Sequence, residues 1–398
     1  MMQRPIRTLL FSTLYPSAVR PVHGIFVETR LRELLKSGEV ETKVVAPVPW
    51  FPLTGEHFGD YGKFAATPHF EQRNGVDVFH PRYFLLPKMG MNSAPYALAR
   101  GALPTIRKLI RDGFDFDLID AHYYYPDGVA AGFIAKALKK PFIVTARGTD
   151  INVIPDYPVP RQLILDTAQA AAASIGVSRA LIDKLAGLGA AREKLDVFRN
   201  GVDLQRFELL PRDKARQHIG IGASSEDYLM LSVGNLVELK GHHLAIEALA
   251  KMPKGTRLAI IGKGSERARL ESLSRQLGVA DRVHFAGLVL PDQLKWWYSA
   301  ADVLVLCSSR EGWPNVLLEA MACGTPVVAT NVGGVAEMLA MEVGILLPSR
   351  SSEALTFALE NLCAARPDRQ QVRHHAEQFA WDETSRAQLQ LFKRICHA

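Results

Sequence analysis

The repeated alternation of short apolar strands with helical segments limits the fold of this 398-residue chain more than any other feature. In the second half, the segments LMLSVGN, RLAIIGKG, RVHFAGL, DVLVLCSS and PVVATNVGG are each followed by a helical stretch. Strands of continuous apolar residues joined by helical crossovers predict a parallel sheet that is covered on both faces.

The first half of the chain carries the same pattern, with strands predicted at 8–15, 42–46, 117–121 and 173–178 and helices at 25–36, 127–138 and 179–188. A turn-rich segment around residues 199–213 separates the two series. We therefore predict an α/β protein with two doubly wound, Rossmann-like domains, 1–203 and 204–378, followed by a last segment, 379–398.

The composition is that of a globular protein, and the length allows ample buried cores. The N-terminal apolar stretch stops at Pro16, too short for a signal peptide or a membrane span, and no later run reaches spanning length. We expect a soluble, cytoplasmic protein. Neither a disulfide framework nor a zinc site is expected, because no Cys-x-x-Cys pair occurs among the four cysteines, Cys307, Cys323, Cys363 and Cys396.

The formal net charge of +6 permits an anionic partner without naming one, and we expect no nucleic acid. Residues 82–111 mix apolar and aromatic side chains with basic ones and contain no acidic residue. One interpretation is a helix with a solvated face and a core-facing side. The other is a surface that docks on an anionic acceptor or on anionic lipid at the inner face of the plasma membrane. The basic residues are Arg82, Lys88, Arg100, Arg107, Lys108 and Arg111.

Ligands of doubly wound sheets bind beyond the carboxyl ends of the strands. Gly24 opens a helix after the first strand, His122 follows DLIDA, the loop GNLVELKG (234–241) follows LMLSV, and Glu311 follows DVLVLCSSR. A lone histidine is more often packed or hydrogen-bonded, but at a strand end beside a cleft it becomes a candidate functional group. Two such edges facing each other would make one site between the domains.

The segment SSREGWPNVLLEAMACGTPVVAT (308–330) places two glutamates around a short helix, predicted to start after Pro314 and to end at Gly324. Glu311 lies in the loop before this helix. Glu319 lies inside it among apolar residues, where a carboxylate without partners is unfavourable.

An ionised carboxylate has two acceptor oxygens and suits a vicinal diol. The ribose of a nucleotide would therefore suit Glu319, and a second ring such as a sugar would suit Glu311. The alternative is that each glutamate pairs with an arginine, for example Arg310 or Arg199.

Three further motifs bear on ligand binding. GNLVELKG ends in Lys240-Gly241 at a helix start, which suits a phosphate, although the P-loop order is absent. GKGSER (262–267) lacks the third glycine of a nicotinamide fingerprint, because position 267 is arginine. DFD (115–117) precedes its strand and is interpreted as a surface turn. No cluster has metal-ligand spacing, so neither a metal nor a cofactor is implied.

Several segments together resemble the retaining glycosyltransferases of family 4. The glutamate, seven-residue gap and glutamate from Glu311 to Glu319 are that family's pattern, and EGWPNVLLEAMACGTPVVATNVGG around them resembles the family almost residue for residue. GNLVELKG, IIGKGSERARL, FRNGVDLQRF and the closing FAWDETSRAQLQLFKRI are similar too. The resemblance covers nearly the whole chain and is strongest over residues 198–340, and similar sequences usually serve bacterial surface polysaccharide assembly.

The resemblance implies a GT-B architecture, in which two Rossmann-like domains face across a cleft and the last helix crosses back to the N-terminal domain. It implies that Glu319 binds the ribose hydroxyls, Glu311 those of the transferred sugar, and Lys240 the departing diphosphate. His122 would contact the donor sugar or its reacting end. The other donor-binding positions implied are Gly24 (amides for the diphosphate), Leu288 and Val289 (near the base), Gly312 and Asn315.

Two positions depart from the family's pattern. The family often has arginine where Asn235 stands, so one cation of the diphosphate site is missing. It often has histidine where Arg147 stands, and Arg147 is a candidate for replacing the lost charge.

The prediction is a retaining, metal-independent hexosyltransferase. It would move a hexose from a nucleoside diphosphate sugar to a glycan or lipid-linked glycan in cell-surface polysaccharide biosynthesis. Two alternatives share the architecture. A nucleotide-sugar epimerase would turn over the donor without an acceptor, and a non-catalytic partner of another transferase would bind the donor without turnover.

Overall fold

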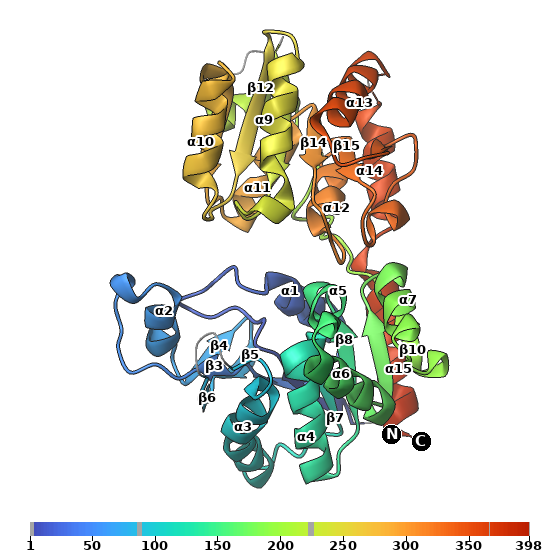
Figure 1. Cartoon of the computed structure of the whole chain (residues 1–398). Coiled ribbons are helices and arrows are strands. Elements are labelled where there is room, and N and C mark those ends of the chain that lie inside the picture. Colours follow the sequence, from blue (N-terminus) through green and yellow to red (C-terminus); the bar gives the residue numbers. More distant parts are fainter. Residues whose placement is uncertain (1–3, 86–89, 222–226, 366, 398) are drawn as a thin grey trace. The chain divides into compact units, whose positions relative to one another are not determined.

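The computed structural model describes residues 4–85, 90–221, 227–365 and 367–397 (Figure 1). The chain divides into two compact units. Unit 1 consists of Met1–Asn200 together with Asp382–Ala398, and unit 2 consists of Gly201–Trp381. The predicted boundaries, after residues 203 and 378, each lie a few residues from these, and the last helical segment belongs to unit 1.

The main sheet of unit 1 has the strand order β10-β9-β8-β7-β1-β2-β5-β4, and every pair in it is parallel except β4 with β5. A separate two-stranded sheet joins β3 to β6. The strands are β1 (Ile6–Phe11), β2 (Val40–Val45), β3 (Val48–Pro49), β4 (Phe70–Arg73), β5 (Val76–Phe79), β6 (Arg82–Tyr83), β7 (Leu118–His122), β8 (Phe142–Ala146), β9 (Ala173–Gly176) and β10 (Leu195–Val197).

Helices cover both faces of this sheet, which is why every residue of its central strands β7 and β8 is buried. Helices α1 and α15 pack against one face, where Leu34 and Phe392 lie in one cluster with Leu118 and Ile143. Helices α3, α4 and α6 pack together on the other face (Figure 1). The helices of unit 1 are α1 (Ile25–Leu35), α2 (Asp60–Ala66), α3 (Ala94–Arg111), α4 (Val129–Leu138), α5 (Thr149–Asn152), α6 (Pro158–Ala170), α7 (Arg179–Gly187) and α15 (Trp381–Cys396).

Unit 2 is a six-stranded parallel sheet of order β13-β12-β11-β14-β15-β16. Helices α9 and α13 pack on one face and share a core with the sheet, while α8, α11, α12 and α14 contact one another in a second layer. Its elements are β11 (Tyr228–Val233), β12 (Thr256–Ile261), β13 (Val283–Gly287), β14 (Val303–Leu306), β15 (Val327–Thr330), β16 (Gly344–Leu347), α8 (Arg212–Ile219), α9 (His242–Lys251), α10 (Arg267–Gln276), α11 (Pro291–Ala300), α12 (Asn315–Ala322), α13 (Ser352–Ala365) and α14 (Arg369–Glu377).

Short helical turns complete the two units. Their bounds are η1 (Glu56–Phe58), η2 (Tyr124–Gly128), η3 (Ile154–Asp156), η4 (Arg192–Lys194), η5 (Glu238–Lys240), η6 (Ala280–Arg282) and η7 (Val335–Glu337). Unit 2 matches the predicted doubly wound pattern closely. The short helix predicted between Pro314 and Gly324 is α12, which Pro314 precedes and Cys323 ends.

Three predictions for unit 1 were wrong. The strand predicted at 8–15 spans Ile6–Phe11, so it ends before residues 12–15. The helix predicted at 127–138 begins at Val129, because the residues before it form the wider turn η2, in which Tyr125 is not helical. The sheet was predicted as wholly parallel, but β4 runs antiparallel to β5. The alternating burial of β4, with Phe70 and Gln72 exposed, gave no continuous apolar run by which the sequence could have marked a strand.

Candidate functional site

The loop after β11 carries Lys240 and is packed tightly against the end of β14. Gly241 begins α9 with φ 70°, and a Cβ there would lie 2.1 Å from the carbonyl oxygen of Cys307. Only glycine allows both this left-handed backbone and this close approach. The loop therefore brings Lys240 to the carboxyl edge of unit 2.

Lys240 and Glu311 form an ion pair at this edge. Lys240 Nζ lies 2.6 Å from Glu311 Oε1, and Ser308 Oγ donates to the same oxygen at 2.6 Å. The backbone behind Glu311 is close-packed as well, since a Cβ at Gly333 would lie 2.0 Å from the Glu311 carbonyl oxygen. Strands β11 and β14 are neighbours and parallel, so the residues that follow them meet.

Glu319, on α12, is held by a tyrosine. Tyr298 of α11 donates its hydroxyl hydrogen to Glu319 Oε2 at 2.7 Å. Burial raises the pKa of Glu319, while the hydrogen bond from Tyr298 and the charge of Arg206 act in the opposite direction. The phenol itself is fully buried, and burial together with the neighbouring carboxylate raises its pKa well above the usual value.

Asn235 is exposed, and its backbone is ordered by the buried His242. His242 Nε2 donates to the Asn235 carbonyl at 3.2 Å, and its Nδ1 accepts from Ser232 Oγ at 2.8 Å. Burial lowers the pKa of His242 to about 4, so the ring is neutral near pH 7. The amide of Asn235 therefore stands where the family's pattern often has a cation.

The remaining predicted positions of unit 2 lie along the same edge of the sheet. Val289 is in the loop after β13, Gly312 is buried and its carbonyl accepts from Gly334 N at 3.1 Å, and Asn315 is the first residue of α12. These placements are set by strand order, because β13, β11 and β14 all end at this edge.

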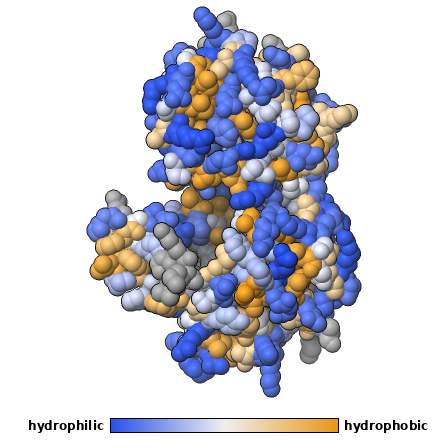
Figure 2. Space-filling model, in the orientation of Figure 1, coloured by the Kyte–Doolittle hydropathy of each residue, from blue (hydrophilic) through white to orange (hydrophobic). Residues whose placement is uncertain are grey.

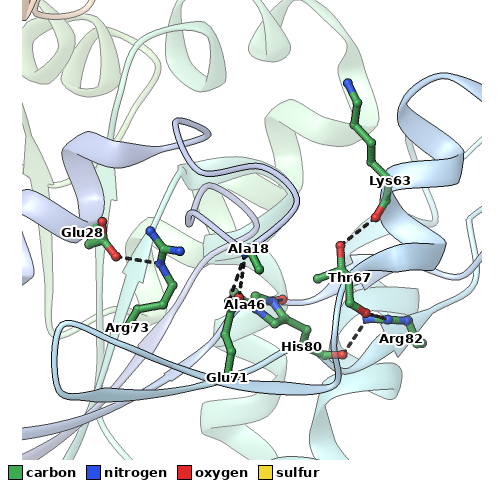
Figure 3. A network of polar contacts seen from close by, with 9 residues as sticks. All are labelled: Ala18, Glu28, Ala46, Lys63, Thr67, Glu71, Arg73, His80 and Arg82. Atoms are coloured by element: carbon green, nitrogen blue, oxygen red, sulfur yellow. Dashed lines mark hydrogen bonds and ion pairs between the residues drawn. The ribbon is translucent and has the colours of Figure 1, made fainter. Parts of the chain in front are cut away.

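In unit 1, Gly24 precedes α1 with φ 67°, and a Cβ there would lie 2.3 Å from the Leu14 carbonyl oxygen. The loop before it is tied to the sheet by the network in Figure 3. Glu71 of β4 accepts from Ala18 N at 3.0 Å and from His80 Nε2 at 2.8 Å. The edge strand that the sequence did not reveal thus anchors the loop leading to Gly24.

His122 and Arg147 are brought into contact at the ends of β7 and β8. An Arg147 N–H donates to His122 Nδ1 at 2.6 Å, and another donates to Asn200 Oδ1 at 3.0 Å. His122 Nε2 lies 3.4 Å from Asp120 Oδ2. The His122 side chain is 1% exposed, and burial lowers its pKa to about 4.

A buried polar network continues behind this histidine to the last helix. Gln388 of α15 donates to Asp120 Oδ2 at 2.9 Å and accepts from Arg30 Nε at 2.8 Å. Burial and the neighbouring Arg30 lower the pKa of Arg147 to about 9. Two guanidinium groups, of Arg30 and Arg147, therefore share these surroundings with two carboxylates, of Asp120 and Asp150.

Each of the two glutamates has a hydrogen-bond partner other than the arginines considered above. Lys240 and Ser308 bind Glu311, and Tyr298 binds Glu319. No local motif in the sequence marks Tyr298, Asp120 or Gln388, so none of the three was predicted. Ser308 carried a usable signal, because it follows a strand three residues before Glu311.

The acidic turn DFD lies before β7 and is occupied by basic groups. Asp117 lies 2.7 Å from an Arg4 nitrogen, and Asp115 lies 2.6 Å from Lys140 Nζ. Within the described ranges, no group of three or more His, Cys, Asp or Glu side chains could hold a metal ion. Within the same ranges, no helix combines the length and apolar character needed to cross a membrane.

Comparison with known proteins decides the family. Residues 29–206 match the family described as Glycosyltransferase Family 4, and residues 213–379 match Glycosyl transferases group 1. The chain is 30% identical over 353 residues to a D-inositol 3-phosphate glycosyltransferase of Xylanimonas cellulosilytica, covering 82% of this chain and 84% of that protein. This chain belongs to glycosyltransferase family 4.

A second relative of this glycosyltransferase is a putative teichuronic acid biosynthesis glycosyltransferase, TuaC, of Bacillus subtilis. The two are 29% identical over 360 residues, which cover 89% of this chain and 88% of TuaC. The match therefore extends over both units.

Solved structures give the fold of this family 4 member as GT-B. Sucrose-phosphate synthase of Thermosynechococcus elongatus superposes with a TM-score of 0.79 at 20% identity, covering 98% of this chain and 99% of that one. HepE of Anabaena in complex with UDP-glucose superposes with a TM-score of 0.72 at 20% identity, covering 98% and 99%. The two units are thus the two Rossmann-like domains of a GT-B glycosyltransferase.

Proposed function

We propose that this glycosyltransferase is a retaining hexosyltransferase that uses a nucleoside diphosphate hexose and a glycan or lipid-linked glycan acceptor. The observation that carries the proposal is the Lys240–Glu311 ion pair at the carboxyl edge of unit 2, with Glu319 on the helix that follows. One cation and two carboxylates along this edge suit a diphosphate, a sugar and a ribose, in that order.

The proposed roles follow from the chemistry of each group. Lys240 would bind the diphosphate as a point charge, and its pairing with Glu311 would place the carboxylate beside the sugar that the diphosphate carries. Glu319 would accept hydrogen bonds from the ribose hydroxyls. The HepE structures with UDP and with UDP-glucose support a nucleotide-sugar as the donor class.

In the proposed transfer, the acceptor hydroxyl oxygen attacks the anomeric carbon on the face that the diphosphate leaves. A carbon–oxygen bond to the acceptor forms while the bond to the diphosphate breaks, and the hydroxyl proton passes to the leaving diphosphate. The protein's contribution would be charge stabilisation by Lys240 and positioning, with no enzyme nucleophile and no metal.

His122 is proposed to act at the donor as a neutral group rather than as an acid or a base. Arg147 already donates to Nδ1, and Asp120 lies beside Nε2, so neither ring nitrogen is poised to exchange a proton. Arg147 is held at the same place and is proposed to add positive charge near the donor.

The acceptor class is proposed from the relatives. TuaC is named for teichuronic acid biosynthesis, and the similarly folded WaaB is a lipopolysaccharide outer core galactosyltransferase. Both names refer to cell-surface glycans. A role in cell-surface polysaccharide assembly, in the cytoplasm, is therefore proposed for this chain.

The outer face of α3, together with the exposed Phe84, is proposed to dock on anionic membrane. Phe84 and Tyr96 are 62% and 54% exposed, and the exposed Arg100, Arg107 and Arg111 follow on α3. The opposite side of α3, which includes Leu98 and Ile106, packs in the core. The helix thus has the predicted core-facing side as well as a basic outer face.

One member of the predicted basic stretch does not contribute to that face. Arg82 turns inward and donates to the carbonyls of His80 and Thr67 (Figure 3), and Lys88 lies outside the described residues. Figure 2 shows a mostly hydrophilic surface on which apolar groups are scattered, with orange groups on the projection where Figure 1 draws α2.

The test is a donor screen followed by acceptor trials. The purified protein is titrated with UDP-, GDP- and ADP-hexoses, and the donor that binds best is then incubated with lipid-linked and free glycans in the presence of EDTA. Transfer with retained anomeric configuration, read by NMR of the product, supports the proposal. Turnover of the donor without any acceptor would identify an epimerase, and binding without turnover across the acceptor panel would identify a non-catalytic partner.

A further inference from the structure

The hydrogen bond between Tyr298 and Glu319 joins two helices behind the carboxyl edge of unit 2. The Tyr298 hydroxyl lies 2.7 Å from Glu319 Oε2, and the phenol ring is fully buried. A buried phenol that donates to a carboxylate restricts that carboxylate to one rotamer, since every other rotamer loses a charge-assisted bond.

The tyrosine is itself fixed from several sides. Its carbonyl accepts from Thr325 Oγ1 at 2.6 Å, and its ring meets the ring of Phe207 edge-on at 5.9 Å between centroids. Neither contact involves the hydroxyl. The ring would therefore stay in place if the hydroxyl alone were removed, and only the bond to Glu319 would be lost.

We infer that Tyr298 is a positioning residue that holds Oε2 of Glu319, directs Oε1 at the donor, and so makes this glycosyltransferase select ribose over deoxyribose nucleotides. The inference rests on the proposed role of Glu319 at the ribose. A carboxylate in one fixed rotamer favours a ligand that presents two hydroxyls at a set place. A mobile carboxylate would tolerate a ligand with only one hydroxyl.

The same bond acts on the charge of Glu319. Burial raises the pKa of Glu319, and the Tyr298 hydrogen bond and Arg206 lower it. Burial, and after it the charge of Glu319, raise the pKa of the Cys323 thiol, and Arg369 and Arg373 of α14 donate to carbonyls at the end of α12. Among these groups, Tyr298 is the hydrogen-bond donor to the Glu319 carboxylate. Removing its hydroxyl should therefore raise the pKa of Glu319, so that Glu319 becomes protonated at a higher pH.

The test uses Tyr298→Phe in the full chain, with Tyr228→Phe as the matched control. Tyr228 lies in the same unit, and its buried hydroxyl has no hydrogen-bond partner among the described residues. The dissociation constants of UDP, 2′-deoxy-UDP and 3′-deoxy-UDP are measured by calorimetry for wild type and both variants, from pH 5 to 8. If ADP or GDP binds more tightly than UDP, that nucleotide and its 2′-deoxy and 3′-deoxy forms are used instead.

Wild type and Tyr228→Phe are expected to prefer the ribonucleotide by about tenfold. In Tyr298→Phe the preference should fall to about twofold, and the acid limb of binding should shift to higher pH. An equal weakening of all three ligands with an unchanged ratio would mean a merely structural role and overturn the inference, as would an unchanged acid limb.

A second variant covers the case in which Tyr298→Phe does not fold. Glu319→Gln keeps the side-chain shape and an oxygen that accepts a hydrogen bond from Tyr298, but the glutamine amide does not titrate in this pH range. The variant should abolish the ribose preference, and its acid limb should be the part that the terminal phosphate of the ligand contributes, with a pKa of roughly 6. A retained ribose preference would overturn the inference. Absence of nucleoside diphosphate binding by wild type would instead count against the proposed function.

Discussion

Lys240 Nζ lies 2.6 Å from Glu311 Oε1, so a cation that follows β11 and a carboxylate that follows β14 form one pair. The contact exists because β11 and β14 are neighbouring parallel strands that end at the same edge. The pair is mostly shielded from solvent, with side-chain exposures of 22% and 10%. Charges in such a place interact through little screening water.

Replacing Lys240 by alanine should lower the turnover number of the transferase by at least ~10²-fold, because the leaving diphosphate loses its one cation on this loop. Initial rates at saturating donor measure the effect. Lys295→Ala is the matched control, since Lys295 pairs with Glu208 at 2.6 Å and its side chain is 25% exposed. Near-normal turnover in Lys240→Ala would remove this lysine from the mechanism.

The two glutamates should fail in different ways. Glu319→Ala should weaken both the nucleoside diphosphate and the donor by roughly 1–3 kcal/mol, the cost of lost charge-assisted hydrogen bonds. Glu311→Ala should lower turnover, because the carboxylate is proposed to act at the sugar, but it should bind the nucleoside diphosphate at least as tightly as wild type, because Lys240 loses its ion-pair partner. Calorimetric titration of both variants decides this, and equal losses would show that the division of roles is wrong.

Adding the missing cation should strengthen product binding. Asn235 is exposed in the loop that carries Lys240, so Asn235→Arg has room for its side chain and should tighten nucleoside diphosphate binding by about 1 kcal/mol, roughly fivefold in Kd. Turnover should fall if product release becomes limiting. A correctly folded Asn235→Arg with unchanged affinity would contradict the idea.

Arg147→Ala tests the other candidate for that charge. If the Arg147 guanidinium adds positive charge near the donor, its loss should weaken nucleoside diphosphate binding. It should also free His122 Nδ1, to which Arg147 now donates. Arg192→Ala, which removes an exposed arginine elsewhere in unit 1, provides the control for the change in net charge. Unchanged binding in Arg147→Ala would leave Lys240 as the main cation.

Stability should fall as the pH drops from 6.5 to 4, partly because His242 is buried and neutral. Its pKa is lowered to about 4, so in this window the unfolded chain binds a proton there that the folded chain does not. A full shift of this size is worth roughly 3 kcal/mol. His242→Gln should therefore flatten the fall of the melting temperature with decreasing pH, whereas His69→Gln, at an exposed position, should not.

The outer face of α3 should bind vesicles of anionic lipid in a salt-sensitive manner. Each basic residue near such a surface contributes ~1 kcal/mol, so a variant combining Arg100→Ala, Arg107→Ala and Arg111→Ala should co-sediment much less at low salt. The control is a variant with alanine at three exposed basic residues elsewhere in unit 1, Arg179, Lys184 and Arg192, which changes the net charge by the same amount. If wild type stays in the supernatant at low salt, the basic face of α3 is only a solvated helix side.

The amino-acid sequence by itself determined the plan of the protein. Its alternating apolar strands and helices specify two doubly wound units, because that periodicity depends only on residues within one element. The ends of the strands can be located from the local sequence in the same way, and ligands bind at that edge of the sheet. Four candidate site residues that follow strands could therefore be predicted, namely Lys240, Glu311, His122 and Arg147. The bounds of α12 were also predictable, since the residues flanking it act locally.

The tertiary structure alone decided which side chains meet. Tyr298 reaches Glu319 from another helix, and Gln388 reaches Asp120 from 268 residues away. The edge strand β4, which ties down the loop before Gly24, depends likewise on its pairing with β5. These contacts follow from strand order and helix packing. Both bring together residues that are far apart in the sequence, and the local sequence around one residue does not indicate its partner.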